Sequence, residues 1–225
     1  MSAAPIRVLL VDDHAVVRSG YRLYLEETRE ITVVAEAATA DEAYRAYREH
    51  GPDVVVMDVA MPGSGGIEAL RRIVAANPQA RVLMFTMHDN PTFASQALRS
   101  GAIGFVTKDS PPDFLVRAVI SAARGRRVLS PKVAEDMAFS VAQPEQNRFA
   151  ELSPREFEIC RLRASGYGFA DIAAHLKLSP KTIANHLSLA RAKLDVDSDI
   201  ELFRLAVQAG IVPFDPVAAQ SDQDH

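Results

Sequence analysis

The fold is decided by the stretch Val8-Leu9-Leu10-Val11-Asp12-Asp13-His14, in which an apolar run ends abruptly in acidic residues. The run begins at Ile6 and, apart from Arg7, is apolar on consecutive positions rather than on every second one. A strand with that pattern is buried on both faces, which is typical of the interior of a parallel sheet. We therefore interpret residues 6–11 as the first strand of such a sheet.

Short apolar runs recur along the first half of the chain, separated by longer segments with helical spacing. They cover residues 31–35, 54–57, 81–85 and 104–106. A protein of two packed β-sheets is the alternative, but the intervening segments are too long for hairpin turns. The alternation up to residue 124 predicts an α/β fold with a five-stranded, doubly wound parallel sheet.

After residue 150 the strand signals disappear and only helical patterns remain. We expect a helix from 131 to about 142, a polar linker over 141–148, and four helices beginning near residues 154, 169, 180 and 199. The final residues are polar and contain two prolines. We predict an α/β domain over 1–128, a linker helix and linker over 129–150, an all-α four-helix domain over 151–212, and a disordered tail over 213–225.

Composition sets limits on location and partners. The 225 residues are 48% hydrophobic and 24% charged, with a formal net charge of -4, so any nucleic-acid surface has to be a local basic patch. The single cysteine, Cys160, cannot form an internal disulfide, and its apolar neighbours indicate a buried thiol in a reducing compartment. The apolar run at the N-terminus is too short for a signal or membrane helix, so we expect a cytoplasmic protein with no membrane partner.

Polar groups follow four of the predicted strands at the point where each strand ends. Asp12 and Asp13 follow the first strand, Asp58 the third, Thr86 the fourth, and Lys108 the fifth. In an open parallel sheet these positions meet at one edge. Three carboxylates brought together need a cation, and Mg²⁺ with its preference for oxygen ligands is the natural one. An aspartate beside Mg²⁺ can attack a phosphoryl group, although each residue alone also has a plain structural explanation, such as a helix cap or a solvated charge.

Three motifs resemble the receiver domain of response regulators over residues 6 to about 125. They are residues 8–14, Val-Leu-Leu-Val-Asp-Asp-His; residues 56–62, Val-Met-Asp-Val-Ala-Met-Pro, followed by Gly66; and Thr86 with Gly101-Ala102 through Lys108. The resemblance implies a flavodoxin-like sheet and phosphorylation of Asp58 by a partner sensor histidine kinase.

The resemblance also implies a role for each site residue. Asp13, Asp58 and the Ala60 carbonyl would bind Mg²⁺, with Asp12 assisting through water. Lys108 and the Thr86 hydroxyl would contact the phosphoryl group, and Phe105 occupies the position of the aromatic switch. One departure is Asp109, where many receivers have proline, and Ala60 and His88 fall where the dephosphorylation rate is tuned.

Two enzyme classes compete with this interpretation. Phosphatases of the haloacid-dehalogenase type need a second aspartate two residues after the nucleophile, and Ala60 stands there. A dinucleotide-binding fold needs a glycine-rich turn after the first strand, where this chain has Asp12-Asp13-His14. We expect no enzyme activity beyond the receiver's own phosphoryl transfer and autodephosphorylation.

The predicted helix over 180–194 has one apolar stripe, which fixes the opposite face. Ile183, Leu187, Ala190 and Leu194 recur at spacings of four, three and four. No acidic residue occurs between Ile172 and Leu194, which makes this segment the local basic patch. A bundle with a merely solvated charged face is the alternative, but the short helix, tight turn and capped second helix favour a helix-turn-helix. The candidate DNA-binding residues are Lys177, Lys181, Thr182, Ala184, Asn185, Ser188, Arg191 and Lys193.

Residues 150 to 212 resemble the LuxR-type output domain, which with the receiver makes the chain similar to the NarL/FixJ subfamily. The resemblance rests on Leu-Ser-Pro-Arg-Glu at 152–156, Asp-Ile-Ala at 171–173, Leu-Ser-Pro-Lys-Thr-Ile at 178–183, and Gly166, His186, Lys193, Leu194 and Val196. Departures are Gly168, Asp171 and Arg163, the last at a commonly apolar position. Ala184 and Ser188 fall where some relatives carry contact lysines, so DNA affinity is expected to be modest without a dimer.

The two halves together suggest one mechanism. We expect phosphorylation of Asp58, sensed through Thr86 and Phe105, to shift the helix over 91–100 and free the second domain to form a homodimer on double-stranded DNA. The last helix is either a dimer surface or part of its own domain's core. The alternative is a phosphorylation-independent DNA-binding regulator, or a scaffold that uses the receiver only for partner contacts.

Overall fold

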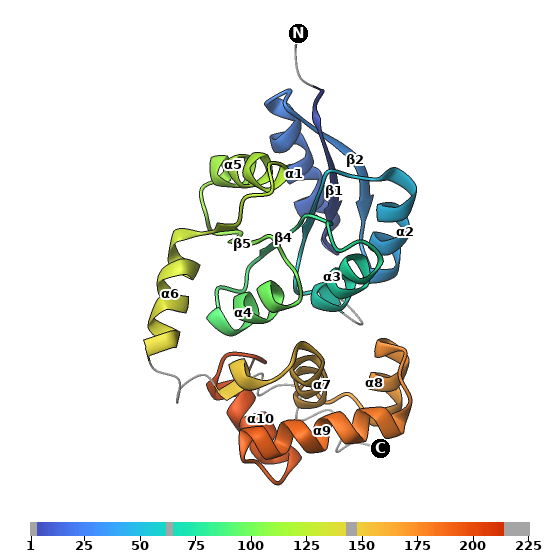
Figure 1. Ribbon diagram of the computed structural model, residues 1–225, viewed down its shortest axis with the longest axis vertical. Helices are drawn as coiled ribbons and strands as arrows, with labels where there is room; N and C mark the ends of the chain where they lie inside the picture. Colours follow the sequence, from blue (N-terminus) through green and yellow to red (C-terminus); the bar gives the residue numbers. More distant parts are fainter. Residues whose placement is uncertain (1–3, 62–64, 143–147, 214–225) are drawn as a thin grey trace. The chain divides into compact units, whose positions relative to one another are not determined.

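The computed structural model describes residues 4–61, 65–142 and 148–213. Within these limits the chain divides into two compact units, residues 1–142 and 143–225. Figure 1 labels the elements of both units.

The first unit is a parallel sheet with the strand order β2-β1-β3-β4-β5-β6. Its strands are β1 (Ile6–Val11), β2 (Ile31–Ala37), β3 (Val54–Met57), β4 (Val82–Thr86), β5 (Gly104–Thr107) and β6 (Val128–Leu129). The doubly wound parallel sheet is confirmed, but it has six described strands where five were predicted. Two apolar residues carry no periodicity, so only the pairing of Gly104 with Val128 and of Phe105 with Leu129 reveals β6 as a strand.

Helices cover both faces of this sheet (Figure 1). They are α1 (Ala15–Glu27), α2 (Ala40–His50), α3 (Gly65–Ala76), α4 (Pro91–Arg99) and α5 (Pro112–Ala123). Leu25 of α1 and Leu115 of α5 pack in one buried cluster with Val8, Val56 and Phe85 of the strands. Helices α2, α3 and α4 lie on the opposite face, so the strands are buried from both sides, as their unbroken apolar runs require.

Helix α6 (Pro131–Ala142) packs on the sheet unit rather than standing apart as a linker. Val133 is fully buried, and α6 contacts α4 and β5. The backbone N–H of Ser130, just before α6, donates to the Phe105 carbonyl at 3.1 Å. The compact unit therefore ends at residue 142, whereas the sequence placed the domain boundary at 128. Residues 143–147 of the predicted linker lie outside the described residues.

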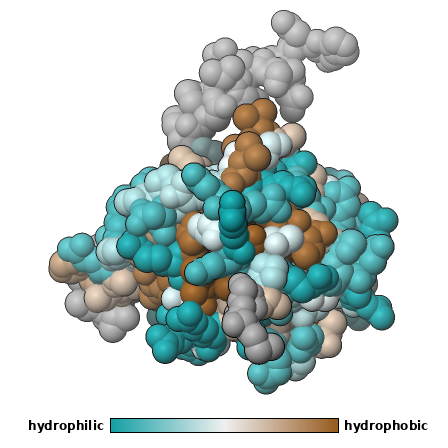
Figure 2. Space-filling view, turned by 90° about the horizontal axis from the view of Figure 1, so that it is seen from above, coloured by the Kyte–Doolittle hydropathy of each residue, from teal (hydrophilic) through white to brown (hydrophobic). Residues whose placement is uncertain are grey.

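The surface of the first unit carries several exposed apolar side chains. Val16 and Leu23 on α1 and Met87 after β4 are 87%, 73% and 71% exposed. In the space-filling view of Figure 2, hydrophobic residues gather near the middle of the visible face, with hydrophilic residues around them. Polarity on this unit is therefore unevenly distributed.

The second unit is all helical in its described part. A short 3-10 helix (Arg148–Glu151) precedes α7 (Pro154–Ala164), α8 (Phe169–Leu176), α9 (Pro180–Leu194) and α10 (Asp199–Gln208). Ser153 and Glu156 form a capping box at the start of α7, and the Ser179 hydroxyl caps α9 by accepting from the Thr182 N–H at 3.1 Å. The predicted disordered tail, apart from residue 213, lies outside the described residues.

The core of this unit contains Cys160, which is fully buried as expected. Burial raises the pKa of its thiol to about 12, with the nearby Glu156 carboxylate acting in the same direction. A thiol with so high a pKa stays protonated and is a packing residue.

Candidate phosphoryl-acceptor site and DNA-reading helix

The strand-end groups meet at one edge of the sheet. Asp12 and Asp13 follow β1, Asp58 follows β3, Thr86 is the last residue of β4, and Lys108 follows β5. Strands β1, β3, β4 and β5 are consecutive neighbours, so their carboxyl ends lie side by side. The sequence-predicted convergence is therefore present in the structure.

Lys108 joins two of these carboxylates. Its Nζ donates to Asp12 Oδ2 at 2.5 Å and to Asp58 Oδ2 at 2.5 Å. All three side chains are buried: 6% of Lys108, 4% of Asp12 and 5% of Asp58 is exposed. Burial alone would lower the pKa of the Lys108 ammonium, but the hydrogen bonds to Asp12 and Asp58 outweigh it and the pKa is raised. Lys108 is thus charged at neutral pH.

Backbone hydrogen bonds of the sheet hold the three residues in place. The Asp12 N–H donates to the Ala37 carbonyl at 3.1 Å, and the Asp58 N–H donates to the Val11 carbonyl at 2.9 Å. The Lys108 N–H donates to the Thr86 carbonyl at 2.8 Å. The site is therefore built on the ends of rigid strands, which limits the movement of each group.

The backbone around Asp58 is also fixed from its own loop. The Ala60 N–H donates to Asp58 Oδ1 at 3.1 Å. Gly66, at the start of α3, lies so close that an added Cβ would stand 1.8 Å from the Asp58 carbonyl oxygen. Only glycine fits there, which explains why the motif after Asp58 includes it.

The acidic group fits a hard divalent cation. Asp12, Asp13 and His14 each offer a ligand atom, and these atoms lie within 4.8 Å of one another. Asp13 Oδ1 is buried and accepts no hydrogen bond from the described residues, although His14 Nδ1 lies 3.0 Å away. Three carboxylates against one ammonium leave negative charge uncompensated. Carboxylate oxygens are the ligands that Mg²⁺ prefers, so the aspartates of this group fit that ion.

A cavity of about 640 Å³ opens beside this group. Asp58, Ala60 and Lys108 contribute to its wall at the acidic site. The remaining wall is mainly apolar and comes from α1, from His14 just before it, from Met87 and from Pro112. Its α1 residues are Val16, Val17, Gly20, Tyr21 and Tyr24.

Thr86 and Phe105 are both fully buried. The Thr86 hydroxyl accepts from the His88 N–H at 3.3 Å, within the loop that leads to α4. Phe105 lies on β5, which pairs with β4 on one side and β6 on the other. Both residues thus sit where a shift at the acidic edge would reach α4 and β6.

In the second unit, α9 has the two faces that the sequence predicts. Its buried residues are the four members of the apolar stripe, Ile183, Leu187, Ala190 and Leu194. On the opposite face Lys181, Ala184, Asn185 and Ser188 are exposed, and Thr182 is partly buried. This face of α9 is therefore open to a ligand.

Two of the candidate DNA-binding residues have carboxylate partners inside the unit. Lys193 Nζ donates to Glu156 Oε2 at 2.6 Å, and Arg191 Nη2 donates to Asp199 Oδ1 at 2.5 Å. Lys177 ends α8 in a left-handed conformation. Sequence reasoning missed Glu156 and Asp199 as partners, because a pairing between distant helices leaves no trace in spacing. The one available signal was Arg163, a charged residue at a commonly apolar position, which also pairs with Asp199.

Comparison with known families agrees with this geometry. Residues 8–120 match the response regulator receiver domain, and residues 150–206 match the bacterial regulatory proteins of the luxR family. This chain belongs to the two-component response regulators. Within the residues that the structure describes, this response regulator has no helix long and apolar enough to cross a membrane.

Relatives match the response regulator over nearly its whole length. The response regulator UvrY of Escherichia coli (strain K12) is 36% identical over 217 residues, covering 96% of this chain and 100% of UvrY. The response regulator GacA of Pseudomonas aeruginosa is 36% identical over 209 residues, covering 92% and 98%. These relatives and its LuxR-type output domain place the response regulator in the NarL/FixJ subfamily.

Solved structures resemble both units. A LuxR-family response regulator from Aurantimonas sp. SI85-9A1 is 50% identical, with a TM-score of 0.61, over 62% of this chain and 99% of that one. RcsB from Salmonella enterica serovar Typhimurium, solved bound to the promoter rprA in the presence of phosphomimetic BeF3-, is 28% identical. It has a TM-score of 0.72 over 89% of this chain and 98% of that one.

Proposed function

We propose that Asp58 accepts a phosphoryl group from a phosphohistidine of a sensor kinase and that this event controls DNA binding by the second unit. The observation that carries the proposal is the buried Lys108 ammonium, which bridges Asp12 and Asp58. In the transfer, an Asp58 carboxylate oxygen forms a bond to phosphorus while the bond from phosphorus to the histidine nitrogen breaks, leaving an acyl phosphate and a free imidazole.

The residues around Asp58 suit this step. Mg²⁺, held by Asp13, Asp58 and the Ala60 carbonyl with Asp12 assisting through water, would supply positive charge to the phosphoryl oxygens. Lys108 would exchange its hydrogen bond with the Asp58 carboxylate for one with a phosphoryl oxygen. Because Lys108 also binds Asp12, the ammonium stays anchored while that exchange takes place.

The cavity beside Asp58 supports a protein donor. Its apolar wall from α1 can take the body of a helix or an imidazole ring, while Asp58 and Lys108 supply the polar part. Exposed Val16 and Met87 extend this apolar surface outside the cavity. We propose that the kinase domain docks across α1 and presents its phosphohistidine here.

The output step is DNA binding through the exposed face of α9. The Thr86 side chain would turn toward the phosphoryl group, and the Phe105 ring would change its orientation in response. Both movements would shift α4 and the elements that pack against it. Lys181 in the first turn of α9 and Asn185 one turn later suit a phosphate and a base edge. Promoter-bound RcsB with a phosphomimetic supports this assignment by analogy. We further propose that the protein binds DNA as a homodimer and that exposed Ile200 on α10 contributes to the contact.

Intact-protein mass spectrometry after incubation with Mg²⁺ and a small phosphodonor tests the acceptor. We expect a labile phosphoryl adduct on the wild type and on Asp109→Asn, which removes a neighbouring exposed carboxylate, but none on Asp58→Asn. An adduct on Asp58→Asn would place the acceptor elsewhere. Absence of any adduct on the wild type would leave a DNA-binding protein controlled by partner contacts alone.

A further inference from the structure

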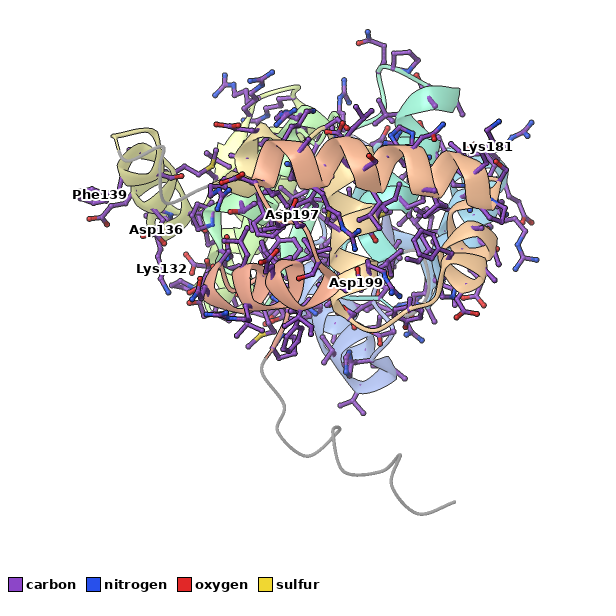
Figure 3. All side chains as sticks on the ribbon, turned by 90° about the horizontal axis from the view of Figure 1, so that it is seen from below. Lys132, Asp136, Phe139, Lys181, Asp197 and Asp199 are labelled. Carbon is purple, nitrogen blue, oxygen red and sulfur yellow. The ribbon has the colours of Figure 1, made fainter. Side chains whose placement is uncertain are left out.

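One carboxylate in the second unit holds two arginines from different helices. Asp199, the first residue of α10, accepts from Arg163 Nη2 of α7 at 2.5 Å and from Arg191 Nη2 of α9 at 2.5 Å. Figure 3 shows Lys181 at one end of α9, and Asp197 and Asp199 in the segment that leads from the other end into α10. We call Arg163, Asp199 and Arg191 the arginine clamp.

Helix α8 joins the same cluster through Arg163. Arg163 Nη1 donates to the Tyr167 carbonyl at 3.0 Å, in the turn between α7 and α8. The Arg163 guanidinium also lies over the ring of Phe169, the first residue of α8, with 5.3 Å between its Cζ and the ring centroid. All four α-helices of the described second unit therefore meet at the arginine clamp.

We propose that Arg191 is a positioning residue that sets the angle of α9 through the arginine clamp, and that it makes no contact with DNA. The proposal rests on the proposed function, in which the exposed face of α9 reads DNA. It reverses the sequence interpretation, which grouped Arg191 with the DNA-contacting residues.

The geometry favours positioning over phosphate binding. The Arg191 side chain is 28% exposed, and its Nε is buried without a hydrogen-bond partner among the described residues. The hydrogen bond from Arg163 lowers the pKa of Asp199, and the one from Arg191 adds to this effect, so the carboxylate is fully charged at neutral pH. To reach a phosphate, Arg191 would have to leave a charged, close partner. An arginine that is paired with a carboxylate and fixed between helices is better suited to hold α9 in position than to bind a DNA phosphate.

The two roles predict opposite effects when Asp199 loses its charge. If Asp199 only competes with DNA for Arg191, Asp199→Asn frees an arginine, and both specific and non-specific DNA binding become tighter. If the arginine clamp positions α9, the same variant lets the helix shift, and base recognition suffers while phosphate binding elsewhere persists. Asp197→Asn is the matched control, because it removes an exposed carboxylate two residues away that does not belong to the clamp.

The experiment uses the full chain and two DNA probes. One is a duplex selected from a random library by the wild-type protein, and the other is an unrelated duplex of equal length. Affinities are measured over a range of salt concentrations for the wild type, Asp199→Asn, Arg191→Met, Arg163→Met and Asp197→Asn. Each phosphate that the protein no longer neutralises reduces the slope of log affinity against log salt by about 0.9.

We expect all three clamp variants to bind the selected duplex about tenfold more weakly, since a displaced helix no longer aligns all its side chains with the base edges. Affinity for the unrelated duplex and the salt slope should stay unchanged, and Asp197→Asn should behave as the wild type. Arg163→Met is decisive because α7 carries no candidate DNA residue. Circular dichroism confirms that each variant is folded, and Arg191→Lys, which keeps one hydrogen bond, should recover part of the affinity.

Other outcomes overturn the proposal in distinguishable ways. A smaller salt slope for Arg191→Met, or tighter binding by Asp199→Asn, would show that Arg191 contacts a phosphate. A wild-type protein that binds the two duplexes equally would overturn the proposed function itself. The proposed role of the arginine clamp in base recognition would then be refuted as well.

Discussion

Lys108 donates a 2.5 Å hydrogen bond to Asp58 inside the first unit, where neither side chain is more than 6% exposed. The same ammonium binds Asp12, so a single cation neutralises part of a group of three carboxylates. A buried ion pair contributes little net stability, but removal of one partner leaves an uncompensated charge and costs much more. Lys108 therefore affects both the chemistry and the stability of the receiver.

Lys108→Met should destabilise the first unit, and Mg²⁺ should restore much of the loss. Loss of the ammonium leaves Asp12 and Asp58 as buried carboxylates without a cation. This should lower the free energy of unfolding of the first unit by about 3–5 kcal/mol. Urea unfolding with EDTA and with Mg²⁺ measures both values. Lys132→Met is the control, because Lys132 pairs with Asp89 on the surface and the loss of a solvent-screened pair should cost far less stability than the loss of Lys108. Equal, small losses in the two variants would contradict the prediction.

Gly66→Ala should disturb the loop that carries Asp58. The added methyl group would meet the Asp58 carbonyl oxygen at 1.8 Å, so the backbone has to move, at a cost of about 1–3 kcal/mol. Phosphoryl adduct formation should also slow, since the Asp58 carboxylate loses its alignment with Lys108. Gly20→Ala in α1 meets no atom within 4 Å and should instead stabilise by about 0.5–1 kcal/mol. Chemical unfolding and timed intact-mass measurements compare the two variants. A Gly66→Ala variant with unchanged stability and an unchanged rate of adduct formation would contradict the prediction.

The first unit could be predicted from the sequence because its signals are local. Strands buried on both faces produce unbroken apolar runs, and the groups at their ends must meet once the sheet is parallel. Strand β6 and the packing of α6 on α4 escaped prediction. A strand of two residues is too short to show a hydrophobic pattern. A helix next to a linker has the same kind of sequence whether it packs against the domain or stands apart from it.

The second unit was predicted in its helices but not in its charges. The apolar stripe of α9 follows from periodicity, and all four of its residues are buried. Arg191 and Lys193 face Asp199 and Glu156, and those pairings depend on how the helices pack. Long basic side chains can turn toward either DNA or a nearby carboxylate, so the sequence alone left their partners open.

The second unit should lose stability at acid pH partly through Asp199. The hydrogen bond from Arg163 lowers the pKa of this carboxyl below its ordinary value. Its contribution is thus present above the unfolded pKa of about 3.9 and is lost as the pH falls through the lower, folded value. Its side chain is 42% exposed, so solvent screening keeps the effect small. Hydrogen exchange of α7 and α9 amides between pH 6 and pH 3 should show a shallower acid loss in Asp199→Asn than in Asp197→Asn, and identical profiles would refute the assignment.

Lys181 and Asn185 should differ in how they contribute to DNA binding. Lys181 lies in the first turn of α9, is exposed and has no ion-pair partner among the described residues. The helix dipole does not stabilise a cation at this end of the helix, so Lys181 is not explained by helix stability. Lys181→Gln should therefore weaken binding to selected and unrelated duplexes alike and reduce the salt slope by about 0.9 for each phosphate left without its cation. Asn185→Ala should leave that slope unchanged and relax the preference at one base pair, by about 1–3 kcal/mol. Arg48→Gln, an exposed charge on α2, controls for net charge. If Lys181→Gln instead changed base preference and Asn185→Ala changed the salt slope, the orientation proposed for α9 on DNA would be wrong.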